Sequence, residues 1–276
     1  MKIRYRIAFR DSESPELMKI LEQHKFKYKR VAMPGEVDAL IGFDIHDDHV
    51  AWERISDLVK RHNMGDLPLN IFSKEEILQA PWCRVKLVNP VGYPQPENKW
   101  LSTHFTYAGF DAKSGIFSHQ IEPFRIKREP ALKYKQFMTL FWIHELFAKK
   151  EVIEKFEKAG FQGFEVSDVI INSSGRPSEV ISQIVIPKIT EANALLANHP
   201  LSKTDSDVVK YLPHTRGMLP YSNALLQETA DFVLSKEWFG DGGMAYREIL
   251  VSQRVSHLFL ENGWSGIFLE PLQIDS

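Results

Sequence analysis

Residues 145–170 read ELFAKKEVIEKFEKAGFQGFEVSDVI, and residues 248–273 read EILVSQRVSHLFLENGWSGIFLEPLQ. The two stretches align without a gap at a constant offset of 103 residues, and five of their 26 positions are identical. The identical positions in the first stretch are Glu145, Val152, Phe156, Gly160 and Gly163. This pairing organises the whole C-terminal part of the chain.

The spacing of the shared residues has a physical meaning. Val152 and Phe156 are four residues apart, so they lie on one face of a helix. Gly160 follows at a position where a helix ends in the left-handed conformation that glycine adopts at little cost. Each stretch is therefore predicted to fold as strand, helix, Gly-x-x-Gly and strand, and the pair predicts an internal duplication.

The similarity extends upstream of both stretches. Residues 124–129, FRIKRE, resemble residues 232–237, FVLSKE, once a gap of a few residues is allowed. The predicted repeats then cover about 111–170 and 213–273. Coincidence is the alternative interpretation, because helix, glycine and strand recur in many unrelated proteins.

The N-terminal residues form a different pattern. Residues 2–10 alternate between apolar and basic side chains, which is typical of a half-buried strand. Pro15 stands at a favourable first helical position, and the Pro34-Gly35 turn separates two further strand-like runs. We predict a small βαββα module at residues 1–65, followed by the duplicated region at residues 66–276. The fold class is α/β, of the α+β kind.

Composition places the chain among ordinary soluble globular proteins, with 276 residues of which 43% are hydrophobic and 25% charged. A formal net charge of −2 gives no overall reason to expect a nucleic acid or an anionic membrane as partner. The N-terminus lacks an apolar run of signal-peptide length, and no run approaches a membrane span. A single cysteine, Cys83, leaves no intrachain disulfide or cysteine-rich metal site. We expect a reduced, cytosolic protein that binds no cofactor.

Residue types that carry chemistry give weak signals here. His144-Glu145 lacks the second histidine of a zinc-protease helix. Because Glu145 recurs as Glu248 without the histidine, a structural role such as an ion pair is the better interpretation. His46-Asp47-Asp48-His49 could hold a metal, but consecutive residues point in different directions, so a helix-capping turn is favoured. Cys83 is predicted to be a buried structural thiol. No catalytic set can be named.

Basic residues in the predicted N-terminal strands offer an alternative function. Lys2, Arg4, Arg6 and Arg10 share one strand face, and Lys25, Lys27 and Lys29 share another. Such strands could bind nucleic acid, although the aromatic residues that would stack on bases alternate onto the opposite face. Solvent, an acidic partner or the nearby Asp44, Asp47 and Asp48 could equally balance this charge.

The C-terminus carries a resemblance to a known family. Residues 247–272, REILVSQRVSHLFLENGWSGIFLEPL, preceded by Glu237-Trp238-Phe239-Gly240, resemble the end of the double-Cys-x-x-Cys-Gly immunity proteins. Residues 72–77, FSKEEI, and 92–97, GYPQPE, are similar to the middle region of that family. Its members accompany bacterial polymorphic toxins. The resemblance covers most of the chain from about residue 70.

This chain departs from the family at its defining motifs. Both Cys-x-x-Cys-Gly knuckles are missing, and their remnants are Asp111-Ala112-Lys113-Ser114-Gly115 and Pro213-His214-Thr215-Arg216-Gly217. Four thiolates on two knuckles would suit a structural zinc ion. Each remnant keeps its glycine and would belong to one repeat. The loss removes the thiolate metal site, so packing must hold these loops instead.

The resemblance implies a function of binding. We expect a non-enzymatic immunity protein of the bacterial cytoplasm that inhibits a cognate toxin domain by covering its active site or target surface. Irregular stretches at 90–115, 199–219 and 238–243 are the candidate surfaces, because binding residues favour loops. The candidate partner-binding residues are Tyr93, Trp100, Asp205, Asp207 and Asp241. An enzyme is a third hypothesis, which a cluster of perturbed titratable groups in a deep pocket would favour.

Overall fold

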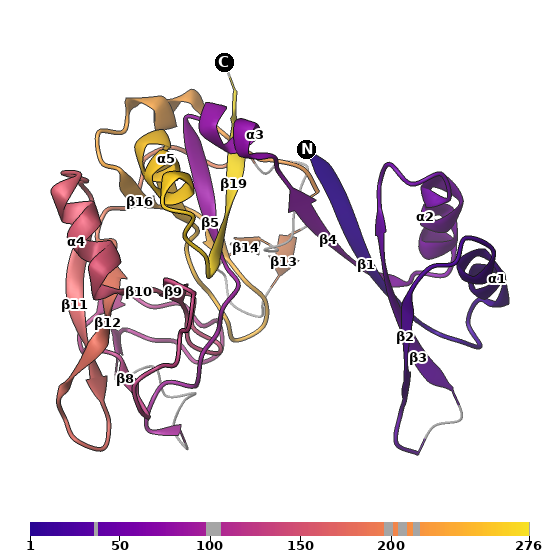
Figure 1. Cartoon of the computed structure of the whole chain (residues 1–276), viewed down its shortest axis with the longest axis horizontal. Helices are drawn as coiled ribbons and strands as arrows, with labels where there is room; N and C mark the ends of the chain where they lie inside the picture. Colours follow the sequence, from indigo (N-terminus) through magenta and orange to yellow (C-terminus); the bar gives the residue numbers. More distant parts are fainter. Residues whose placement is uncertain (36–37, 98–105, 196–200, 204–208, 212–215, 276) are drawn as a thin grey trace. The chain divides into compact units, whose positions relative to one another are not determined.

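A computed structural model describes the chain except for residues 36–37, 98–105, 196–200, 204–208, 212–215 and 276 (Figure 1). Helices and strands in several sheets make the fold mixed α+β, as the sequence predicts. The contacts divide the chain into two units. The first contains Met1–Ser73 together with the short segment around Arg216 and Gly217, and the second contains the remainder from Lys74 onward.

The first unit is one antiparallel sheet with two helices. Its elements are β1 (Lys2–Arg10), α1 (Pro15–Gln23), β2 (Tyr28–Ala32), β3 (Ala39–His46), α2 (Trp52–Arg61) and β4 (Gly65–Ile71). The strands are ordered β2-β3-β1-β4, which is the split βαβ arrangement of ferredoxin-like folds. Tyr5, Ile7 and Phe9 alternate inward from β1, and α1 and α2 bury their apolar faces with them in one core.

Strand β4 extends this unit beyond the predicted βαββα module. Its sequence, GDLPLNI, places exposed Leu67 and Ile71 on one face and buried Asn70 on the other, and Pro68 argues against an interior strand. It forms the edge of the sheet, where Pro68 pairs with Tyr5 of β1. Among the described residues, no further strand of this sheet lies on the other side, so the missing N–H of Pro68 breaks no hydrogen bond to a second neighbour. The first unit therefore continues to Ser73 and does not stop at residue 65.

The acidic turn before α2 does not cap that helix, which corrects the prediction. The N-cap residue is Ala51, which has no capping side chain, and its N–H donates to His49 Nδ1 at 3.1 Å and not to an aspartate. Asp47 instead accepts the backbone N–H of Ile3 at 3.0 Å, and Asp48 pairs with Lys2 at 2.5 Å. Both carboxylates hold the start of β1.

The second unit contains two five-stranded sheets. One is ordered β9-β10-β12-β11-β8 and the other β16-β18-β5-β19-β15. The strands of the first are β8 (Arg125–Ile126), β9 (Phe137–Met138), β10 (Leu146–Lys149), β11 (Glu165–Ile171) and β12 (Pro177–Val185). Those of the second are β5 (Trp82–Leu87), β15 (Leu219–Tyr221), β16 (Phe232–Leu234), β18 (Ile249–Ser252) and β19 (Ile267–Ile274).

Shorter elements complete this unit. They are α3 (Lys74–Gln79), β6 (Tyr107–Ala108), β7 (His119–Gln120), α4 (Lys150–Lys158), β13 (Leu201–Lys203), β14 (Val209–Tyr211), the 3-10 helix at Asn223–Gln227, β17 (Trp238–Phe239) and α5 (Gln253–Glu261). β6 and β7 form a hairpin, while β13, β14 and β17 form a small sheet. In the part of the chain that the structure describes, no helix is long and apolar enough to cross a membrane.

The two aligned stretches have the same succession of elements. β10 and α4 correspond to β18 and α5 at an offset of 103 residues at every boundary. The glycines that follow also match, because Gly160 and Gly263 have φ angles of 67° and 60°. We retain common origin as an inference from this correspondence.

Contacts between the two stretches are reciprocal. A Cβ atom on Gly163 would lie 2.3 Å from the carbonyl oxygen of Phe232, and one on Gly266 would lie 2.2 Å from that of Phe137. These glycines have φ angles of 93° and 107°, so both backbone conformation and space require glycine. Each stretch thus places its second glycine against the edge strand of the other.

Strand pairing changes the upstream alignment. β16 pairs with β18, and the strand in the same position beside β10 is β9, not β8. Phe137 is therefore the counterpart of Phe232. The predicted match of residues 124–129 with 232–237 is wrong, because these two segments do not hold equivalent positions in the two sheets. The backbone agrees, since Phe137 donates to Ser265 O at 3.2 Å and Phe232 donates to Gln162 O at 3.1 Å.

The central strands of the two sheets are also equivalent. β12 lies between β10 and β11, while β5 lies between β18 and β19 although it precedes all of them in sequence (Figure 1). Phe147 pairs with Gln183, and its counterpart Leu250 pairs with Arg84. Gln183 and Arg84 therefore occupy the same position in the two sheets, and the same register equates Val185 with Lys86.

Candidate functional site

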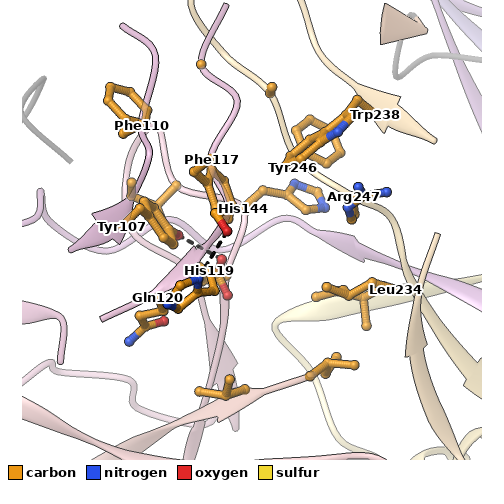
Figure 2. A pocket seen from close by; sticks show the side chains of 18 of the residues that line it. Tyr107, Phe110, Phe117, His119, Gln120, His144, Leu234, Trp238, Tyr246 and Arg247 are labelled. Atoms are coloured by element: carbon orange, nitrogen blue, oxygen red, sulfur yellow. Dashed lines mark hydrogen bonds between the residues drawn. The ribbon is translucent and has the colours of Figure 1, made fainter. Parts of the chain in front are cut away.

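The second unit contains a pocket of about 650 Å³ (Figure 2). Side chains from both five-stranded sheets line it, together with the β6–β7 hairpin and the loop before β18. Its aromatic walls are Tyr107, Phe110, Phe117, Trp142, Trp238 and Tyr246. A mostly apolar hollow with a few polar groups is the usual form of a binding site.

The β6–β7 hairpin forms one wall. Tyr107 and Phe117 stack with ring centroids 3.8 Å apart, and Phe117 meets Trp238 edge-on at 5.3 Å (Figure 2). The turn between the strands contains Asp111–Gly115, the first knuckle remnant. Ser114 Oγ donates to Asp111 Oδ2 at 2.5 Å, and two backbone N–H groups donate to the same carboxylate. Hydrogen bonds therefore close this turn.

A buried lysine ties this turn to the loop before β18. Lys210 of β14 donates to the carbonyl oxygens of Ser114 at 2.7 Å, Gly242 at 2.5 Å and Met244 at 2.9 Å. Desolvation lowers the pKa of its ammonium group. The three acceptors offset part of the cost of burying this charge, and they fix two walls of the pocket relative to each other.

Glu145 is the principal polar group of the pocket. Tyr107 OH donates to Glu145 Oε1 at 2.7 Å, and Gln183 Nε2 donates to Oε2 at 3.3 Å. Gln183 in turn exchanges two amide hydrogen bonds with Gln120, at 2.7 and 2.9 Å. Burial raises the pKa of Glu145 to about 7, although both hydrogen bonds act to lower it. The carboxyl group therefore changes its charge near neutral pH.

His144 and Tyr246 form the opposite side. Their rings stack at 3.6 Å, and burial lowers the pKa of His144 to about 4, so the ring is neutral at pH 7 (Figure 2). His144 Nε2 lies 4.0 Å from Glu248 Oε2, too far for a hydrogen bond, and within the described part of the chain neither atom has another hydrogen-bond partner.

The recurring glutamate has two different environments. Glu248 is fully buried and contacts Arg84 at 3.3 Å and Lys86 at 3.5 Å. The ion pair predicted for this position is therefore present at Glu248. At Glu145 the prediction is wrong, because the described residues place no cation within ion-pair distance and the partners are Tyr107 and Gln183.

The two predicted partner-binding residues that the structure describes, Tyr93 and Asp241, do not line this pocket. Tyr93 is half-buried and stacks on Phe141 at 4.9 Å, and Asp241 is exposed and accepts the N–H of Gly242. Trp100, Asp205 and Asp207 lie outside the described residues. Of the predicted surfaces, parts of 90–115 and 238–243 reach the pocket through the residues on either side of the β6–β7 turn and the glycine-rich loop.

The second knuckle remnant is described only at Arg216 and Gly217. Gly217 exchanges two hydrogen bonds with Asn70, at 3.0 and 2.8 Å, and Arg216 pairs with Asp66 at 2.5 Å. These residues therefore belong to the first unit and not to the second repeat, which corrects the assignment of one knuckle to each repeat.

The remaining sequence signals have structural explanations. Arg6 pairs with Asp44 at 2.9 Å, and Asp44 lies on β3, which separates β1 from β2. Acidic neighbours thus balance the basic face of β1. Cys83 is fully buried as predicted, and burial raises the pKa of its thiol to about 11. Within the described ranges, no three histidine, cysteine, aspartate or glutamate residues group as metal ligands.

Comparisons with protein families, curated proteins and solved structures found no match. The pocket was also missed by the sequence reasoning, because its residues come from segments far apart in the chain. One local signal was available. Glu145 and Glu248 recur at the repeat offset, whereas their neighbours Gln183 and Arg84, which pair with Phe147 and Leu250, follow only from the strand pairing.

Proposed function

We propose that this chain is an immunity protein that binds a cognate antibacterial toxin domain and covers its active site or target surface. The sequence pattern at residues 72–77, 92–97 and 247–272 motivates the proposal. The structural observation that carries it is the open aromatic pocket, whose polar groups mostly satisfy one another and are not arranged as a nucleophile and base. Such a hollow can receive an anchoring side chain of a protein partner.

The rim of the pocket supports this function. Trp142 is 55% exposed and has a φ angle of 67°, a conformation rarely adopted by a bulky residue. An unusual backbone conformation of this kind is often found at binding sites, and here it presents a large aromatic side chain at the surface. Interface energy concentrates on aromatic residues of this kind.

A co-expression experiment tests the proposal. The toxin domain encoded beside this gene should kill cells alone, should be neutralised by this chain, and should co-purify with it. Trp142→Ala should weaken binding by about 2 kcal/mol or more if the residue is a central anchor. Tyr134→Ala is the matched control, because Tyr134 is 73% exposed and lies outside the pocket. Continued killing without co-purification would reject the immunity function.

Acid–base catalysis is the second candidate function. It is favoured by one observation, the Glu145 carboxyl group with a pKa of about 7 in a pocket that also contains Tyr107 and His144. A turnover activity lost in Glu145→Gln, with toxin neutralisation unaffected, would establish it. The nucleic-acid alternative receives less support, because Asp44 and Asp48 form ion pairs with Arg6 and Lys2 of β1. Salt-dependent retention on heparin that Arg6→Glu abolishes would favour it.

A further inference from the structure

The two equivalent glutamates differ in their supply of positive charge. Glu248 receives two cations, Arg84 and Lys86, from the central strand β5. The strand positions that correspond to them beside Glu145 are Gln183 and Val185 of β12. Where one half of the unit has built-in cations, the other half has neutral side chains and a pocket.

The walls of the pocket suit an organic cation. Aromatic faces attract ammonium and guanidinium groups, and this attraction increases when the cation is desolvated. Tyr107, Phe117, Trp142, Trp238 and Tyr246 all contribute to the lining. Arg247 shows the same preference within the chain, because its guanidinium lies 4.3 Å from the centre of the Trp238 ring.

We propose that the pocket receives a lysine or arginine side chain of the protein partner, whose cation pairs with the carboxylate of Glu145. The inference rests on the proposed immunity function and names the chemistry of its anchor. The incoming cation takes the electrostatic role beside Glu145 that Arg84 takes beside Glu248. Ionisation of Glu145 on binding releases its proton to solvent.

The other charged and titratable groups around the pocket are compatible with this assignment. They are Tyr107, His119, His144, Glu165, Tyr246 and Arg247. His144 is neutral at pH 7, and Glu165 adds a second carboxylate. Arg247 is the cation that could compete, but its guanidinium is held over Trp238 and donates to the carbonyl oxygens of Ser235 and Lys236. Glu145 is bound by neutral donors alone among its described neighbours.

Small probes test the site without the toxin. Nα-acetyl-lysine methylamide and its neutral analogue Nα-acetyl-norleucine methylamide, which lacks the ammonium group, are titrated into the full chain at pH 7, with binding followed by NMR of the tryptophan indole N–H groups. The lysine probe should bind about tenfold more tightly or better. Calorimetry in two buffers of different ionisation enthalpy should show proton release with the lysine probe alone.

Three variants define the site. Glu145→Gln should reduce the preference for the lysine probe to within about twofold, while the exposed Glu154→Gln, which makes the same charge change outside the pocket, should retain it. Gln183→Arg, which copies the Arg84 position, should abolish the preference with Glu145 still present. An unchanged preference in Glu145→Gln, or none in the wild-type chain, would overturn the proposal.

Two further results separate the possible sources of the cation. Free n-butylamine binding as tightly as the lysine probe would overturn the assignment to a protein side chain. If Glu145→Gln fails to fold, the test is whether the wild-type chain releases a proton when it binds the lysine probe. Absence of this proton release rejects the site. A failure of toxin neutralisation with intact probe binding would reject the immunity function and leave the cation site standing, so the two failures can be distinguished.

Discussion

Replacing Glu145 with glutamine should remove a specific pH dependence of stability. Burial raises the pKa of Glu145 from 4.5 to about 7, so the folded chain holds this proton more tightly than the unfolded chain. The contribution of Glu145 to the free energy of unfolding therefore falls as pH rises from about 4.5 to about 7, and it levels off above that range. The stabilisation is fully present below the unfolded pKa and is lost as pH passes through the folded pKa.

The magnitude follows from the shift. At about 1.4 kcal/mol per pKa unit, a shift from 4.5 to about 7 corresponds to roughly 3 kcal/mol across this window. The glutamine variant has no such proton to lose, yet its amide oxygen can still accept the hydrogen bond of Tyr107. Between pH 4 and pH 8, the free energy of unfolding of the variant should therefore rise by roughly 3 kcal/mol relative to that of the wild-type chain.

Urea unfolding at half-unit steps from pH 4 to pH 8 measures this difference directly. His144 changes stability in the same range, but it contributes equally to both proteins and cancels in the comparison. Glu154→Gln, an exposed change of the same kind, should run parallel to the wild-type curve. A glutamine variant that also runs parallel would refute the assignment of a buried, proton-binding carboxyl group to Glu145.

Three further predictions concern the surroundings of the pocket. His144→Phe should remove the destabilising contribution that His144 makes as pH falls from about 6.5 to about 4, because burial depresses the pKa of His144 to about 4 and the folded ring resists protonation; the variant should therefore gain stability relative to the wild-type chain over this range, and acid unfolding curves of both proteins check this. Lys210→Met should cost about 2–4 kcal/mol in urea unfolding, since three carbonyl oxygens lose a charged donor, whereas the exposed Lys236→Met should cost less than about 0.5 kcal/mol. Gly266→Ala should cost more than about 3 kcal/mol, because the new Cβ would meet the Phe137 carbonyl oxygen at 2.2 Å, while Gly160→Ala, with open space around it, should cost about 1 kcal/mol; equal losses of melting temperature would contradict the close approach.

The elements that the sequence predicted well are those fixed by local signals. The spacing of Val152, Phe156 and Gly160 defines where α4 packs and where it ends, and the same signals recur around α5. Alternation of Tyr5, Ile7 and Phe9 likewise identifies β1 and its buried face. In each case the information lies within a few residues of the feature.

Features that depend on pairing between distant segments could not be predicted in this way. β5 joins the sheet of β18 and β19 across more than 160 residues, and no local pattern in WCRVKL names its neighbours. β4 was missed because Pro68 argues against a strand and is tolerated only at a sheet edge. The upstream alignment failed for the same reason, since FRIKRE matches FVLSKE in letters but Phe137 takes the position opposite Phe232.

The pocket follows from a difference between the two halves of the second unit. A glutamate recurs at the same place in both, and its neighbour on the central strand decides its chemistry. Arg84 pairs with Glu248 at 3.3 Å and with Glu270 at 2.6 Å, so Glu248 belongs to a buried ionic cluster. Gln183 leaves Glu145 without a cation and beside an aromatic hollow. If the halves share an origin, binding capacity arose where one of them lost its internal charge, and restoring that charge by Gln183→Arg should remove the capacity without removing the carboxylate.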